Sequence, residues 1–245
     1  MNFRIMSNRD RIKSKILKKG KKHWWGDDFD SRFLLISKIK HLENQIILDV
    51  GGGIGIISDE LRSNNIIINL DMSKEDLEVC LKNTENKIHN ICGIMNKIPL
   101  KSDYFDYVIS GSVLQYAKIQ DINKDKHYRK NGQYEYPSVE ETMQEINRVL
   151  KKNGKLLLVT PNNRYYKSVM LEYDELKNTI SNHFSNYSLF CYNTFPRLSK
   201  KYRKLNLASI VPKILSKIKN PDDIINSLIK NGKKNSVSFY VEAKK

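Results

Sequence analysis

The residues with the clearest chemical potential form the stretch Leu-Asp-Val-Gly-Gly-Gly-Ile-Gly at positions 48–55, where an apolar run ends and a helical pattern begins. Asp49 precedes Gly51, Gly53 and Gly55 in the spacing D-x-G-x-G-x-G. Glycine adopts positive φ without strain and lets a ligand approach the backbone more closely than a Cβ would allow. We therefore expect this loop to contact a ligand, although a purely architectural turn is the alternative.

The acids near the loop indicate the kind of ligand. A dinucleotide fingerprint needs the spacing G-x-G-x-x-G and a P-loop needs Gly-Lys-Ser/Thr, and this stretch has neither. The carboxylate of Asp49 would repel a pyrophosphate and attract a cation. Asp71 follows the next apolar run, at the strand tip where an acid accepts hydrogen bonds from ribose hydroxyls. The two acids favour a positively charged nucleoside, while Asp71 alone could serve as a helix cap.

These residues must be positioned by a sheet, because short apolar runs alternate with helical stretches along the chain. The runs cover residues 46–50, 66–70, 87–93, 104–110, 155–160, 186–192 and 237–243. Helices are predicted over residues 55–63, 73–83, 112–118, 138–151 and 171–182. The first five runs are dense in Ile, Leu and Val, which is typical of parallel strands covered on both faces. The pattern predicts an α/β fold with a doubly wound, mostly parallel, seven-stranded sheet.

One helix carries clear boundary signals. Ser138 is placed to cap the helix over residues 138–151, with Glu141 at the capping-box position. The turn Lys-Lys-Asn-Gly, ending at Gly154, is expected to close it.

Four motifs, in order, resemble the class I S-adenosylmethionine-dependent methyltransferases, particularly the small-molecule and lipid methyltransferases with a single Rossmann-like domain. The motifs are LDVGGGIG, NLDMSKEDLEVC, NKIPLKSDYFDYVISGSVLQY and EINRVLKKNGKLLLVTPN, starting at residues 48, 69, 96 and 145. The resemblance covers about residues 30–165. It implies the methyltransferase fold, S-adenosyl-L-methionine as cofactor and no metal.

The resemblance also implies roles for individual residues. The residues it assigns to the cofactor are Asp49, Gly51, Gly53, Gly55, Asp71, Met72, Ile94, Met95 and Ser110. Asp49 would hold the amino group directly or through water, Asp71 would bind the ribose hydroxyls, and Met72 would pack on the adenine, unless it belongs to the core. Ser110 would approach the methionine end.

The chain departs from the family at one cofactor position. Many relatives have an acid after the glycine of the third strand, whereas Ile94 follows Gly93 here. Adenine recognition would then rest on backbone groups near Ile94 and Met95.

The methyl acceptor is expected beyond the strand that carries Ser110. Tyr116 and His127 are the candidates for orienting the acceptor or removing a proton, and packing of the loop by Tyr116 or solvation of His127 are the alternatives. The sequence after Ser110 lacks the Asn/Asp-Pro-Pro-aromatic tetrapeptide of methyltransferases that act on amino groups of nucleobases or glutamine. Those substrates are therefore disfavoured.

The positive charge is concentrated at the two ends of the chain. Residues 1–22 hold nine Lys or Arg against one acid, and residues 196–245 hold thirteen against three, within a total formal charge of +16. Such ends attract an anionic membrane or nucleic acid, or they simply reflect a composition rich in Lys. We expect a basic leader over residues 1–25, a methyltransferase domain over 26–192 and 236–245, and a basic helical insertion over 193–235.

Within the insertion, a second helix is predicted to begin at Asn220 and to stop at Asn231 and Gly232. Its neighbour around residues 210–218 has an apolar stripe bounded by lysines, which suits a membrane interface. Packing on the body of the domain is the alternative.

The remaining features concern location. No apolar run reaches the roughly 18 residues that a membrane span requires, and the charged leader lacks the apolar centre of a secretory signal. Cys80, Cys92 and Cys191 form no closely spaced pair and are expected to be buried. We expect a cytoplasmic protein, associated with the membrane if its basic ends bind there.

The sequence thus predicts a methyltransferase that acts on a small molecule, a lipid or a lipid-linked glycan. The alternatives are an RNA methyltransferase recruited by the basic ends, or a binding protein that uses this fold without catalysis. Nucleic acid is the less favoured partner.

Overall fold

The computed structural model describes residues 34–36, 38–85, 87–118, 138–162, 171–192, 229–231 and 238–245. The described strands are β1 (Ile46–Val50), β2 (Ile66–Asp71), β3 (His89–Cys92), β4 (Phe105–Gly111), β5 (Leu150–Pro161), β6 (Asn186–Tyr192), β7 (Ile229–Asn231) and β8 (Ser238–Lys244). The described helices are α3 (Ile56–Leu61), α4 (Lys74–Asn83), α5 (Val139–Val149) and α6 (Tyr173–His183), with the 3-10 helix η1 (Leu114–Lys118). Residues 34–36 and 38–39 are also helical.

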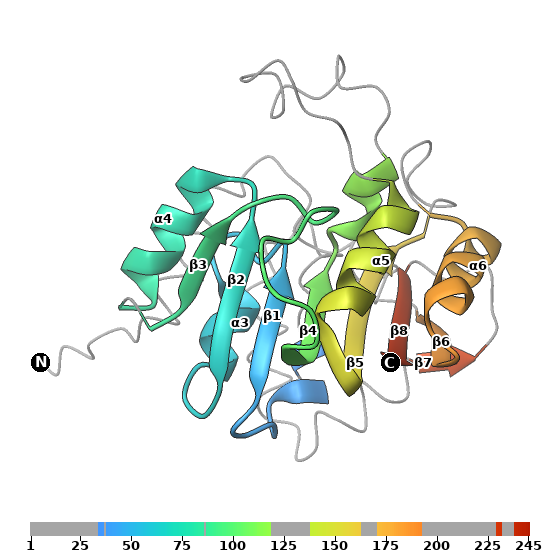
Figure 1. Cartoon of the computed structure of the whole chain (residues 1–245), viewed down its shortest axis with the longest axis horizontal. Coiled ribbons are helices and arrows are strands. Elements are labelled where there is room, and N and C mark those ends of the chain that lie inside the picture. The colour runs from blue at the N-terminus through green and yellow to red at the C-terminus, as the bar shows by residue number, and fades with distance from the viewer. Residues whose placement is uncertain are drawn as a thin grey trace, which may run out of the picture.

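The strands form one mostly parallel sheet in the order β3-β2-β1-β4-β5-β8-β6-β7 (Figure 1). The strands from β3 to β5 are parallel, β8 is antiparallel to both β5 and β6, and β7 is antiparallel to β6. The chain proceeds from β1 outward to β3 and then returns to place β4 on the other side of β1. In such sheets, ligands bind outside the carboxyl ends of the strands where this reversal occurs. The predicted doubly wound fold is confirmed, and its reversal point lies between β1 and β4.

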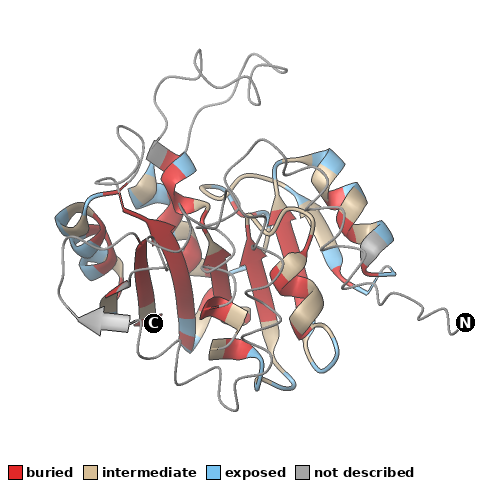
Figure 2. Cartoon of the chain, turned by 180° about the vertical axis from the view of Figure 1, so that it is seen from behind, coloured by how far each residue is buried: buried red, intermediate tan, exposed pale blue. Residues whose placement is uncertain are grey.

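Both faces of the sheet are covered, so successive residues of a strand enter two different cores. Leu48 and Val50 of β1 lie in the core that α5 and α6 complete, whereas Ile47 lies in the core that contains residues of α3 and the helical segment near residue 35. Figure 2 shows the resulting burial along the central strands. This arrangement explains why the strands are continuously apolar in sequence rather than alternating.

The helix starts follow local side-chain chemistry. Ser138 and Glu141 form the predicted capping box of α5, which is confirmed. Ser73 caps α4 by accepting a hydrogen bond from the amide of Asp76. Glu172 and Glu175 form a second capping box at the start of α6, which the sequence analysis did not identify. These caps satisfy amide groups that the first helical turn leaves without partners.

Two sequence predictions are wrong near the carboxyl ends of helices and strands. The predicted helix over residues 112–118 is only the 3-10 helix η1, and it begins at Leu114, after Ser112 in a left-handed conformation with φ 60°. The turn at Lys-Lys-Asn-Gly does not close α5, since β5 already begins at Leu150. Instead the register of β4 against β5 shifts there, and a Cβ at Gly154 would lie 2.9 Å from the carbonyl oxygens of Lys151 and Phe105.

The helix predicted from Asn220 to Asn231 is wrong over its last residues. Ile229–Asn231 is strand β7, which pairs with Phe190, Cys191 and Tyr192 of β6. The seven predicted strands are all present, and β7 makes an eighth at the edge of the sheet. Pairing with β6 decides this segment, and helical spacing of its apolar residues carries no information about that pairing.

Other predictions lie outside the described residues, namely the leader at 1–25, His127 and the remainder of the insertion at 193–235. Of the helices that the structure describes, none is long and apolar enough to cross a bilayer. Cys80 and Cys191 are buried as expected, whereas Cys92 is exposed and the prediction for it is wrong.

Candidate cofactor site

The glycine loop joins β1 to α3 at the point where the strand order reverses. Gly51, Gly53 and Gly55 have φ angles of 71°, 52° and 78°, so all three occupy the left-handed region. The amide of Gly51 donates to the carbonyl oxygen of Leu70 at 2.7 Å, which fixes the start of the loop on β2. The expectation that these glycines are needed for their backbone conformation is confirmed, because other residues are strained there.

The space around the three glycines differs. A Cβ on Gly51 would collide with the side chain of Val113, and a Cβ on Gly55 would collide with the Sγ atom of Cys80. At Gly53 the nearest atom within 4 Å is the carboxylate oxygen of Asp71, at 3.7 Å. Gly51 and Gly55 are therefore also needed for internal packing. Gly53 is the position where the loop leaves room for a ligand to approach.

Asp71 ties the glycine loop to the end of β2. Its carboxylate accepts hydrogen bonds from the amide of Gly53 at 2.8 Å and from the amide of Ser73 at 2.8 Å. Burial raises the pKa of Asp71 above its usual value, and the backbone hydrogen bonds from Ser73 and Gly53 oppose this shift. The carboxylate is only partly buried, so it remains available to hydroxyl donors.

Asn69 is a site residue that the sequence analysis missed. Its side-chain amide donates to the carbonyl oxygen of Gly53 at 3.0 Å, and the residue is fully buried. Because residues two apart on a strand share a face, Asn69 and Asp71 both point toward the loop. The available signal was a single polar residue within the apolar run Ile-Ile-Ile-Asn-Leu.

Asp49 lies beneath the loop rather than on its surface. The residue is fully buried, and its carboxylate accepts a hydrogen bond from the hydroxyl of Ser58 at 2.7 Å. A Cβ on Gly52 would come within 2.6 Å of this carboxylate, so a fourth glycine is needed to cover it. A fully buried carboxylate offers no surface for direct contact with an amino group. The same burial gives the carboxylate no surface for a water molecule, so neither of the two expected routes is seen in this structure.

The ends of β2 and β3 bring the expected adenine residues together. Met72 is 38% exposed and follows Asp71 directly, and the amide of Gly93 donates to the carbonyl oxygen of Asp71 at 3.0 Å. Ile94 and Met95 come next in the chain and are partly exposed. Exposed apolar surface therefore lies beside the Asp71 carboxylate, as a nucleoside requires.

The remaining predicted residues differ in accessibility. Ser110 lies inside β4 and is 2% exposed, so its hydroxyl is not presented to a ligand in this structure. Tyr116 on η1 is 37% exposed and lies beyond the carboxyl end of β4.

The residues present fit a nucleoside with a charged tail. The bare backbone at Gly53 allows close approach, Asp71 supplies an acceptor for hydroxyl groups, and Met72 supplies apolar surface for a base. The carboxyl group of Asp49 lies directly below the loop, where its ionised form would favour a cation above it. S-adenosylmethionine has ribose hydroxyls, an adenine base and a positively charged sulfonium, which are the groups that these residues would accommodate.

Comparison with known proteins agrees with this geometry. Residues 48–158 match the family model described as Methyltransferase domain, a range that begins within β1 and ends within β5. The chain is 28% identical over 134 residues to an uncharacterized protein of Methanocaldococcus jannaschii, which corresponds to 55% of this chain and 48% of that protein. The chain thus spans about half the length of that relative.

Solved structures share the fold at low identity. Phosphoethanolamine N-methyltransferase 2 of Haemonchus contortus, in complex with S-adenosyl-L-methionine, matches with a TM-score of 0.57 and 16% identity, covering 100% of this chain and 61% of that one. A TehB-like SAM-dependent methyltransferase of Corynebacterium glutamicum matches with a TM-score of 0.55 and 12% identity, covering 97% of both chains. Over residues 48–158 the chain therefore resembles methyltransferase domains, and it has the fold of these S-adenosylmethionine-dependent methyltransferases.

Proposed function

We propose that this chain is an S-adenosylmethionine-dependent methyltransferase that binds its cofactor across Gly53, Asp71 and Met72 and transfers the methyl group to a small molecule, a lipid or a lipid-linked glycan. The cofactor supplies an activated methyl group when bound. The chain must then hold the acceptor in line and exclude water, a task that needs positioning more than acid or base groups.

The contacts described above support the proposed cofactor roles. Asp71 binds the ribose hydroxyls, Met72 packs on the base, and the backbone after Gly93 reads the edge of the adenine at Ile94 and Met95. Gly51 and Gly55 shape the loop around Gly53, while Asp49 supports the loop from below, where it accepts a hydrogen bond from Ser58. We give no direct role to the hydroxyl of Ser110, because it is buried.

The observation that carries the substrate class is the segment after β4. It reads Gly-Ser-Val-Leu at residues 111–114. Ser112 is 8% exposed, and Val113 packs where a Cβ on Gly51 would lie. This segment therefore lacks the polar and aromatic groups that hold a planar amino group in nucleobase or glutamine methyltransferases. The phosphoethanolamine enzyme of Haemonchus contortus, named above, acts on a small molecule with the same fold.

Tyr116 and His127 are proposed to orient the acceptor. Tyr116 supports this role by its exposure on η1, directly after the segment at residues 111–114. A tyrosine hydroxyl can donate or accept a hydrogen bond, so it suits either a hydroxyl or an amine acceptor.

The basic ends are proposed to attract an anionic membrane surface, where a lipid acceptor would be concentrated. The support is the charge of residues 1–22 and 196–245 in the sequence. Co-sedimentation with phosphatidylglycerol vesicles, phosphatidylcholine vesicles and bulk RNA, each repeated across salt, tests this. We expect salt-sensitive binding to the anionic vesicles. Preference for RNA would favour the RNA methyltransferase, and indifference to all three would remove the membrane proposal.

Cofactor binding is tested by calorimetry with S-adenosylhomocysteine on the wild type and on Asp71→Ala. We expect binding by the wild type and a large loss in the variant. Unchanged affinity in Asp71→Ala would contradict the assigned site. The acceptor class is then tested by mass spectrometry of separate lipid, small-molecule and RNA fractions, each incubated with the enzyme and methyl-labelled cofactor. Label in the RNA fraction alone would contradict the proposed acceptor class.

A further inference from the structure

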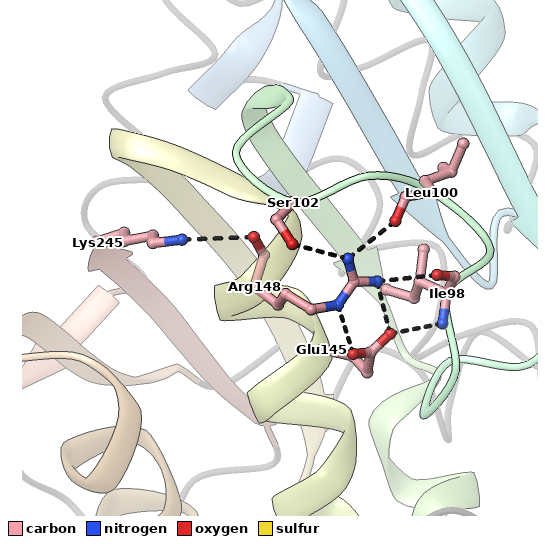
Figure 3. A network of polar contacts seen from close by, with 6 residues as sticks. All are labelled: Ile98, Leu100, Ser102, Glu145, Arg148 and Lys245. Atoms are coloured by element: carbon pink, nitrogen blue, oxygen red, sulfur yellow. Dashed lines mark hydrogen bonds and ion pairs between the residues drawn. The ribbon is translucent and has the colours of Figure 1, made fainter.

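Arg148 on α5 binds the segment that joins β3 to β4 (Figure 3). Its guanidinium donates to the carbonyl oxygens of Ile98 and Leu100, both at 2.9 Å, and to the hydroxyl of Ser102 at 3.1 Å. Two further bonds reach the carboxylate of Glu145, at 2.7 Å and 2.9 Å. A guanidinium has five N–H donors, so every one of them has a partner in this network.

Glu145, three residues earlier on α5, binds the same segment. Its carboxylate accepts a hydrogen bond from the backbone amide of Ile98 at 2.8 Å. Because Arg148 binds the carbonyl oxygen of the same residue, α5 holds both backbone groups of Ile98. The hydrogen bond from Arg148 lowers the pKa of Glu145, and the Glu145 carboxylate raises the pKa of Arg148. Both groups are therefore charged at neutral pH, which strengthens their hydrogen bonds.

The segment held in this way includes the backbone proposed to read the adenine. The amide of Lys97 donates to the carbonyl oxygen of Ile94 at 3.3 Å, which closes a turn over residues 94–97. On one side, Gly93 is bonded to Asp71 at the tip of β2. On the other side, Ile98 is bonded to Glu145 and Arg148. The turn is thus anchored at both ends.

Because position 94 carries no acid, recognition of the adenine would depend on the position of this anchored backbone. A charged side chain can adjust its rotamer to reach a base, whereas a backbone carbonyl or amide has only the position that its turn gives it. Hydrogen bonds weaken steeply with misalignment. Selectivity for adenine at this site would therefore depend on how firmly the turn at residues 94–97 is held.

We propose that Glu145 and Arg148 are positioning residues that set the selectivity of the site for adenine by fixing the turn at residues 94–97. This inference rests on the proposed function. Neither residue touches the base; they act on the backbone that does. Removing one of their hydrogen bonds loosens Ile98 and, through it, the groups at Ile94 and Met95.

The test compares S-adenosylhomocysteine with S-inosylhomocysteine, in which an oxygen replaces the 6-amino group of the base. The ratio of their dissociation constants measures adenine selectivity and is insensitive to a general loss of folded protein. We expect the wild type to prefer the adenosyl compound by about tenfold. In Arg148→Lys, which keeps the charge but loses the planar fork, we expect the ratio to fall about fivefold, which is about 1 kcal/mol.

Two further variants make the result decisive. Glu145→Gln is milder, since it keeps the shape while removing the charge, and it should lower the ratio by about twofold to threefold. Arg62→Lys is the matched control, because Arg62 also pairs with an acid three residues earlier, Asp59, and bonds a backbone carbonyl, that of Thr84. It should change stability without changing the ratio.

The outcomes separate the two claims. A wild-type ratio in both Arg148→Lys and Glu145→Gln, with only a lower melting temperature, would overturn the positioning role. Failure of the wild type to bind S-adenosylhomocysteine would overturn the proposed function, and this inference with it.

Discussion

Asn69 and Asp71 together bind both backbone groups of Gly53. The side-chain amide of Asn69 donates a hydrogen bond to the carbonyl oxygen of Gly53, and the carboxylate of Asp71 accepts one from the backbone amide of Gly53. Two residues of one strand thus satisfy both backbone groups of the loop position that faces open space. The loop is therefore held in its ligand-binding shape by β2 before any ligand arrives. Little conformational ordering would then oppose binding.

Replacing Asn69 by Leu should weaken both the fold and the site. The carbonyl of Gly53 would lose its partner, at a cost of about 1–3 kcal/mol in the free energy of unfolding. Affinity for S-adenosylhomocysteine, measured by calorimetry, should fall several-fold. The matched control is Asn90→Leu, since Asn90 pairs with Asn69 across β2 and β3 but binds the carbonyl of Leu77. Equal losses of affinity in the two variants would contradict the role of Asn69.

Replacing Asp71 by Asn should reduce affinity for S-adenosylhomocysteine by about tenfold to a hundredfold, because hydrogen bonds to a charged group are worth about 1.5–3 kcal/mol. The control is Asp103→Asn, since Asp103 is exposed and paired with Lys245. Asn tolerates the positive φ of that position well.

The affinity of the wild type should also depend on pH. Because burial raises the pKa of Asp71 above 3.8, the carboxylate becomes protonated at a higher pH than an ordinary aspartate. A protonated carboxyl loses acceptor capacity, so affinity falls as the pH is lowered toward this raised pKa. Asp71→Asn should lack that dependence. Parallel pH profiles of the two proteins, measured by calorimetry, would refute the assignment.

Substitution of the loop glycines by Ala should have two different effects, one on stability and one on cofactor binding. Gly55→Ala should destabilise the protein by about 2–4 kcal/mol, because left-handed φ costs about 1–2 kcal/mol and the new Cβ collides with Cys80. Gly53→Ala should cost only the backbone term, yet it should weaken cofactor binding more strongly. Urea denaturation and calorimetry measure the two effects. Cys80→Ala should recover part of the stability of Gly55→Ala and none of the affinity of Gly53→Ala.

Cys92 offers a chemical probe of the adenine side of the site. It is exposed and its Sγ atom lies 3.7 Å from the carbonyl oxygen of Met72, whereas Cys80 and Cys191 are buried. A thiol reagent should therefore modify Cys92 first, and saturating S-adenosylhomocysteine should slow this reaction. Peptide mass spectrometry identifies the modified residue. An unchanged rate with bound ligand would place the base elsewhere.

The sequence was sufficient for the architecture because parallel strands buried on both faces are continuously apolar, and β1 and β6 have the predicted bounds. It was insufficient wherever long-range pairing decides the outcome. The edge strand β7 exists through its pairing with β6, and its three residues fit a helical pattern equally well. Asn69 was missed for the same reason, since its partner lies sixteen residues earlier in a different element.

The sequence predicted where the candidate residues lie along the sheet, but not how deeply each of them is buried. Residue types and spacing located the glycines, Asp71 and Met72 correctly at adjoining strand ends. Whether a carboxylate lies above or below a loop depends on the backbone angles of that loop. The burial of Asp49 depends on how the loop places Gly52 over its carboxylate, and no local pattern in the sequence reports it.

The junction between α5 and β5 has a consequence for how this protein can vary in length. Leu150 caps the helix and already pairs with Phe105 of β4, so no connecting residue separates the two elements. An extra residue at that point would displace Leu150 from its pairing with Phe105 and turn the side chains at the start of β5 to the opposite faces. The irregularity that follows, around Asn153 and Gly154, already interrupts the ladder. Among related sequences, we therefore expect insertions and deletions in this irregular stretch, where the strand pairing is already interrupted. The junction between α5 and β5 should keep a constant length.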